Sequence, residues 1–139
     1  MRRAMVGCLL LVLVAVCGRA ERWWLMQFLE ALVASHGHRY GQLDGLPPGP
    51  ERKVRFGVLF TRDQLAAVDA YLATGPPPGR AAREAVEGHR AAKAGELELY
   101  ERLEAEKRFE LTEAEERREA ELLAEGDRLL HVIGRMADE

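Results

Sequence analysis

Two histidines have the greatest capacity for metal chemistry. His36 and His38 are separated by a single glycine, and Asp44 follows a few residues later. Imidazole and carboxylate groups bind transition metals. Two histidines in a loop are, however, more often solvated polar residues than ligands, so we expect no metal site and no cofactor. His131 is interpreted as a residue near a helix C-terminus that interacts favourably with the helix dipole.

Nucleophilic side chains are scarce. Both cysteines, Cys8 and Cys17, lie among the first twenty residues, and the only serine is Ser35. A nucleophile needs a base and an orienting group beside it, and Ser35 next to His36 does not make a triad. The sequence also lacks a glycine-rich phosphate loop, a Gly-x-Ser-x-Gly elbow and a His-Glu-x-x-His motif. We therefore predict no catalytic residues and a protein that is not an enzyme.

The first twenty residues have the layout of a secretory signal peptide. Arg2 and Arg3 precede an apolar run over residues 6–17, and small residues, Gly18 and Ala20, occupy the positions that signal peptidase reads if cleavage falls before Glu21. The apolar run is shorter than the roughly 20 residues of a membrane-spanning helix. A cleaved signal peptide is thus the favoured interpretation, and it predicts an exported protein, periplasmic or extracellular.

Three alternatives for this segment stay open. Residues 1–20 could remain as an anchor, with membrane contact over residues 4–24, because Trp23 and Trp24 suit the membrane interface. Lipoprotein processing at Cys17 is disfavoured by Val16, where such signals have Gly, Ala or Ser. A misassigned start codon would remove the signal altogether.

Charge argues against a nucleic-acid partner. The protein has 139 residues and a net charge of −3. Losing Arg2, Arg3 and Arg19 from the 20 basic residues leaves 17 against 23 acidic ones, a net charge of −6. An acidic protein is poorly suited to a phosphate backbone. We expect a protein partner or self-association instead, with no small-molecule substrate.

Periodicity divides the remaining sequence into elements. An amphipathic helix is predicted within residues 21–40, ending near His36, and residues 41–53 are rich in Pro and Gly and predict a loop. Alternating apolar residues predict a short extended segment over residues 54–60. Thr61 and Gln64 have the spacing of a capping box for a helix that ends at the Pro/Gly run 74–79.

The rest of the helical domain, which we place at residues 54–139, is rich in Ala, Glu, Leu and Arg. Residues 80–136 contain no proline, and their apolar stripe has an 11-residue period, which indicates a nearly straight path. A second capping-box pattern, Thr112 with Glu115, and a break at Gly126 favour division near Leu111 over one unbroken rod. The fold class is therefore mainly α: a small helical bundle or helical hairpin with one short extended segment.

Apolar stripes of these helices are the candidate contact surface for a protein partner. Its residues are Leu65, Val68, Leu72, Leu103, Leu111, Leu122, Leu129 and Ile133. The simpler interpretation is that the same residues form the core.

One pair of motifs resembles a known family. Residues 60–64 (Phe-Thr-Arg-Asp-Gln) and 111–115 (Leu-Thr-Glu-Ala-Glu) resemble the paired Leu-Thr-x-x-Gln motifs of small periplasmic helical proteins of the envelope-stress chaperone and metal-sensor type. Phe replaces Leu in the first copy and Glu replaces Gln in the second. The resemblance covers residues 60–136 and implies a chaperone-like or scaffold role in the envelope.

A second resemblance covers residues 53–89. A strand followed by two helices looks like the ribbon-helix-helix DNA-binding fold, in which the strand pairs across a dimer and enters the major groove. It would place Arg55, Gly57 and Leu59 against the bases, and only Arg55 suits hydrogen-bonded readout. A DNA-binding dimer is therefore the alternative function if the signal-peptide interpretation is wrong.

Overall fold

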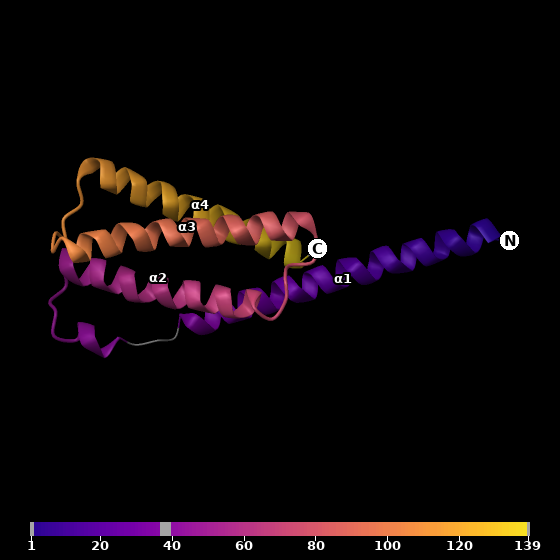
Figure 1. Ribbon diagram of the computed structural model, residues 1–139, viewed down its shortest axis with the longest axis horizontal. Coiled ribbons are helices and arrows are strands. Elements are labelled where there is room, and N and C mark those ends of the chain that lie inside the picture. The colour runs from indigo at the N-terminus through magenta and orange to yellow at the C-terminus, as the bar shows by residue number, and fades with distance from the viewer. Residues whose placement is uncertain (1, 37–39, 139) are drawn as a thin grey trace.

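The computed structural model is an α-helical bundle (Figure 1). It describes the backbone of residues 2–36 and 40–138 and the side chains from residue 19 onward within those ranges. The described part contains the helices α1 (Arg2–Ser35), α2 (Pro50–Leu72), α3 (Arg80–Ala105) and α4 (Glu113–Asp138), with a short 3₁₀ helix, η1 (Gly41–Leu43), before α2. The prediction of a mainly helical protein is confirmed.

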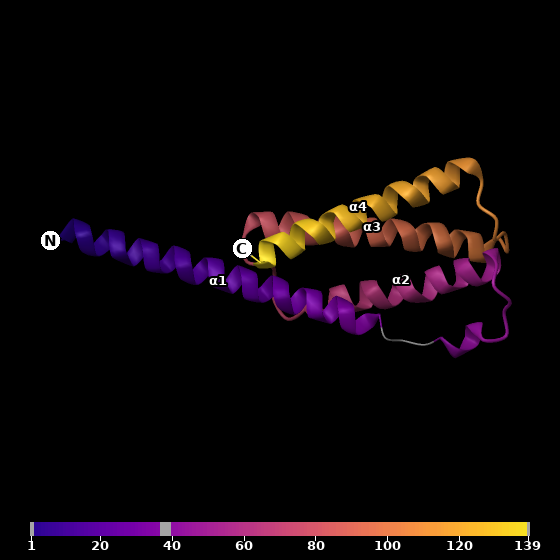
Figure 2. The ribbon, with the colours of Figure 1, turned by 180° about the vertical axis from the view of Figure 1, so that it is seen from behind.

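Helix α1 has two parts in different surroundings. Its first half projects beyond the bundle, whereas its second half lies against α2 and α4 (Figures 1 and 2). None of the helices in the described ranges combines the length and the apolar character that a membrane span requires. The break after Ser35, at the His36 position, agrees with the predicted end of the amphipathic helix.

The extended segment expected over residues 54–60 is wrong, because these residues lie inside α2. Helix α2 begins at Pro50, which occupies its first turn and also makes the end of the expected 41–53 loop helical. Val54 and Val58 are one helical turn apart and fully buried, while Phe56 and Phe60 stack on another side of the helix. The alternating apolar residues therefore belong to two different faces of a helix and not to one face of a strand.

The two remaining turns follow the predicted chemistry. Helix α2 ends at Leu72, and Gly75 and Gly79 adopt positive φ angles of 156° and 95° before α3. Between α3 and α4, Thr112 and Glu115 form the predicted capping box: the Thr112 N–H donates to Glu115 Oε1 (2.9 Å), and the Glu115 N–H donates to Thr112 Oγ1 (3.2 Å). The division near Leu111 is confirmed, whereas α4 continues through Gly126 without a break.

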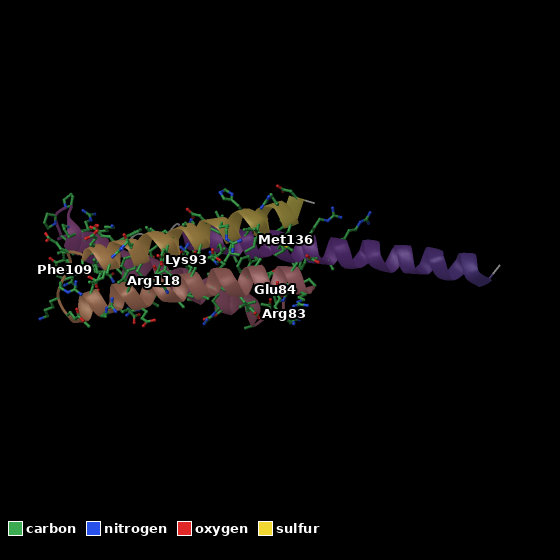
Figure 3. All side chains as sticks on the ribbon, turned by 90° about the horizontal axis from the view of Figure 1, so that it is seen from above. Arg83, Glu84, Lys93, Phe109, Arg118 and Met136 are labelled. Carbon is green, nitrogen blue, oxygen red and sulfur yellow. The ribbon has the colours of Figure 1, made fainter. Side chains whose placement is uncertain are left out.

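Helices α3 and α4 pack antiparallel, and their contacts repeat every seven residues along each helix. The Cα of Gly88 lies against the Leu129 side chain and that of Gly95 against Leu122, so each leucine fills the space of an absent Cβ. One step further, Arg102 forms an ion pair with Glu115 (3.3 Å). Figure 3 shows Lys93 on the side of α3 that faces α4, in the middle of this contact.

Most buried apolar side chains of the described residues form two clusters at opposite ends of the bundle. The first joins α1 to the end of α2, the start of α3 and the end of α4, with Phe28 and Leu25 fully buried in it. The second joins the start of α2 to the end of α3 around Val54 and Leu103. Phe109, at the end of the bundle in Figure 3, extends the second cluster and lies 5.5 Å beneath the Arg55 guanidinium.

Candidate functional site

Most of the predicted contact residues lie between the helices. Five of the eight are buried: Val68, Leu103, Leu122, Leu129 and Ile133. The other three, Leu65, Leu72 and Leu111, are partly buried. The large apolar side chains that reach the surface in the described residues are different ones: Trp23, Met26, Val33, Phe56 and Leu123.

Three of these exposed side chains form a stripe along α1. Trp23, Met26 and Val33 are 63%, 49% and 67% exposed, and their spacing of three and seven residues places them on one face of the helix. Val33 directly follows the buried Leu32 but lies on the exposed face of the helix. We call Trp23, Met26 and Val33 the α1 stripe.

The opposite face of α1 explains why the stripe points outward. Trp24 stacks on Phe28 with ring centroids 5.6 Å apart and meets Tyr71 edge-on at 4.8 Å. The Tyr71 hydroxyl donates to the Trp24 carbonyl oxygen at 2.9 Å. The adjacent tryptophans therefore differ in kind, because Trp24 is a core residue that fixes the rotation of α1 and leaves Trp23 in solvent.

A cavity of about 540 Å³, open to solvent, lies between η1 and the start of α2. Its apolar side consists of Tyr40, Leu43 and Phe56, and its polar side includes Arg52 and the backbone of Gly49. Asp44 and Lys53 also line it. We call this space the α2 cavity.

Tyr40 is held at the cavity wall by two contacts. Its hydroxyl donates to the Asp63 carboxylate, and its ring meets Phe56 edge-to-face at 5.9 Å. Burial, followed by the hydrogen bond to Asp63, raises the pKa of Tyr40 to about 12. The phenol is therefore a neutral donor across the physiological range, and its hydrogen bond orients the ring.

The cations of the cavity differ in how they are paired. Lys53 lies 3.3 Å from Glu119 on α4. Arg52 donates to the Leu46 carbonyl oxygen at 3.3 Å, and among the described residues it forms no ion pair. Arg52 thus has donor groups left for a ligand.

A second cavity, of about 360 Å³, lies on the other side of Leu43. Its cations are neutralised within the protein, since Arg55 pairs with Glu51 at 3.1 Å and Arg62 with Glu101 at 3.2 Å. This cavity offers a ligand fewer free charges than the α2 cavity does.

A layer of buried polar side chains separates the two apolar clusters. It contains Thr61 and Gln64 of α2, His89 and Glu96 of α3, and Glu119 of α4. The Tyr100 hydroxyl donates to Glu119 at 2.7 Å, and burial with this contact raises the pKa of Tyr100. The Lys93 ammonium lies 2.9 Å from Glu96 Oε2 and forms an ion pair with it. The angles at these atoms do not meet those of a hydrogen bond.

Among the residues that the structure describes, the histidines do not form a metal site. His36 Nε2 lies 2.9 Å from the Gln64 amide nitrogen, and His38 lies outside the described residues. His89 is fully buried, its ring edge-on to Phe28, while His131 is exposed. The described residues contain no group of three or more His, Cys, Asp or Glu placed to hold a metal ion.

Comparison with known proteins yields no relative. Neither family models, nor curated proteins, nor solved structures give a match to this protein.

Proposed function

We propose that the protein is a non-catalytic helical module that is exported, or held at the membrane by its N-terminal segment, and binds a protein partner through the α1 stripe. The observation that supports this is the exposure of Trp23, Met26 and Val33 on one face of a helix whose other face is in the core. Exposed apolar patches of this kind are typical of interaction sites.

The chemistry of the stripe supports a protein partner. Trp is enriched in interface hot spots, and Met adapts its shape to different partners. Glu30 is exposed on the same face of α1, between Met26 and Val33, and adds a polar group to the stripe. A chaperone-like or scaffold role fits a helix that presents an exposed apolar stripe to an unfolded or helical segment.

The N-terminal segment supports export. Its basic start, apolar run and small residues before Glu21 are those of a signal peptide. Among the α1 residues whose side chains the structure describes, those that contact the core begin at Trp24, after the proposed cleavage site. Removal of residues 1–20 is therefore compatible with the packing of the bundle.

Partner binding is tested by suppression of the aggregation of reduced insulin. We expect the wild-type protein to slow the rise in light scattering, and the triple variant Trp23→Gln, Met26→Gln, Val33→Gln to lose this effect while keeping its melting temperature. The matched control is Leu123→Gln, which removes an exposed leucine from α4. Equal suppression by the wild type and the triple variant would contradict the assignment of the stripe.

Export is tested by cell fractionation with intact-mass measurement. A product that begins at Glu21 outside the cytoplasm, or a full-length product in the membrane fraction, supports the proposal. Full-length protein recovered from the cytosol would contradict it.

A further inference from the structure

The α2 cavity brings one available cation next to an aromatic wall. Arg52 and Phe56 are four residues apart on α2 and both line the cavity, so they lie on the same side of the helix. Tyr40 meets Phe56 edge-to-face and closes the apolar side together with Leu43. A ligand in this space would contact apolar atoms and a guanidinium at the same time.

Arg52 is poised to bind an anion. Its side chain is half-buried, and its only hydrogen bond among the described residues goes to the Leu46 carbonyl oxygen, which neutralises no charge. A guanidinium carries five N–H donors in a fork that matches a carboxylate. The other arginines near the start of α2 are already occupied, Arg55 by Glu51 and Arg62 by Glu101.

The beginning of α2 adds to the positive potential of the cavity. Gly49 is the N-cap residue of α2. It has no side chain that could cap the backbone amides of the first turn. The partial positive charge of a helix N-terminus favours an anion placed next to it. Opposing this, Asp44 also lines the cavity, although it already has an interaction of its own.

We propose that the α2 cavity is a binding site for a carboxylate that carries an apolar group, with the carboxylate on Arg52 and the apolar group against Tyr40 and Phe56. Two sources share this chemistry: the C-terminus of a polypeptide that ends in a large apolar residue, and a free small acid of the same kind. The site uses no residue of the α1 stripe, so it can be tested independently of the proposed function.

The test is titration of the full-length protein with N-acetylphenylalanine, followed by NMR of the backbone amides. We expect saturable shifts at Tyr40, Arg52 and Phe56. N-acetylphenylalaninamide, which has the same side chain but no carboxylate, should bind on the order of tenfold more weakly, because it loses a charge-assisted hydrogen bond. Equal binding of the two compounds, or no saturable shift at millimolar concentrations, would overturn the proposal.

Variants locate the interaction. Arg52→Gln is expected to weaken N-acetylphenylalanine on the order of tenfold and to abolish its preference over the amide. Phe56→Ala should weaken both compounds. The control is Arg80→Gln, which removes an arginine that is exposed and paired with Glu84 at the start of α3. Loss of binding in Arg80→Gln to the same degree as in Arg52→Gln would overturn the site.

A peptide distinguishes the two sources of carboxylate. A pentapeptide that ends in phenylalanine with a free C-terminus is compared with N-acetylphenylalanine. Tighter binding of the peptide identifies the C-terminus of a polypeptide as the ligand, whereas weaker or equal binding identifies a small acid. The α1-stripe triple variant should bind both as the wild type does, which separates failure of this site from failure of the proposed function.

Discussion

His89 makes the stability of the bundle depend on pH. Its ring is fully buried, and neither ring nitrogen has a hydrogen-bond partner among the described residues. Burial, with a smaller contribution from the nearby Lys93 charge, lowers the pKa of His89 from 6.5 to about 4. Between pH 6.5 and about 4, His89 is therefore protonated in the unfolded protein and neutral in the folded protein. The free energy of unfolding should fall by about 3 kcal/mol as the pH drops through this window, at about 1.4 kcal/mol per pKa unit.

Urea denaturation at a series of pH values measures this fall, and His89→Leu is the control because it cannot titrate. Salt-bridged carboxylates complicate only the lower part of the range: hydrogen bonds from Arg108 and Arg90 hold the pKa values of Glu115 and Asp69 below their ordinary 4.5 and 3.8. The stability that these groups contribute is lost below about pH 4.5. Between pH 6.5 and 4.5 the variant should be nearly flat, and parallel curves for the two proteins would refute the assignment.

Two glycines in helices should respond oppositely to alanine. A Cβ on Gly57 would lie 2.8 Å from the Tyr100 ring, which is held by its hydrogen bond to Glu119, whereas a Cβ on Gly134 would meet nothing within 4 Å. Gly→Ala in a helix interior gains about 1 kcal/mol. Gly134→Ala should therefore raise the free energy of unfolding by about that amount.

Gly57→Ala should lower the free energy of unfolding by about 1–3 kcal/mol, since overpacking against the Tyr100 ring outweighs the gain in helix propensity. Thermal melts of both variants check the two signs, and stabilisation by Gly57→Ala would show that the ring can move.

Two similar capping signals in the sequence have different outcomes. Thr112 begins α4 and forms the capping box with Glu115, while Thr61, with Gln64 at the same spacing, lies in the middle of α2 and is buried. The local pattern is the same at both positions and so cannot distinguish them. The difference is that α2 starts upstream at Pro50, which leaves Thr61 no free backbone amide to cap. The same limit applies to Val54 and Val58, whose alternation fits a strand or one buried helical face until the neighbouring helix is known.

The capping box of α4 is expected to stabilise the bundle. Thr112→Ala removes the acceptor of the Glu115 N–H and should cost about 1 kcal/mol of unfolding free energy. The matched control is Thr74→Ala, because the exposed Thr74 hydroxyl only donates to the Tyr71 carbonyl oxygen at the end of α2. Urea denaturation of both variants measures the difference. Equal stability of the two would mean that the Thr112 hydroxyl contributes nothing beyond the ion pairs that Glu115 forms with Arg102 and Arg108.

For the molecule as a whole, periodicity identified helices more reliably than surfaces. The stripes through Val68, Leu129 and Ile133 are apolar faces as expected, but they pack on one another and form the first cluster. Which apolar face stays open depends on how the helices are rotated in the bundle, and one-dimensional spacing does not contain that rotation. The α1 stripe emerges only because Trp24 and Phe28 fill the core, and the α2 cavity depends on η1 folding back beside α2.

The two halves of α1 should differ in their importance for folding. Removal of residues 1–20 leaves in place every described α1 residue of the first apolar cluster, so the melting temperature should stay within a few degrees of the full-length protein. Removal of residues 1–35 also deletes Trp24, Leu25, Phe28 and Leu32, which are at most 8% exposed. Burial of each such residue contributes about 2–3 kcal/mol, and the sum is a large part of the roughly 5–15 kcal/mol that stabilises a domain. The longer deletion should therefore abolish the cooperative thermal transition in circular dichroism, and a cooperative melt in its absence would mean that α2, α3 and α4 fold without α1.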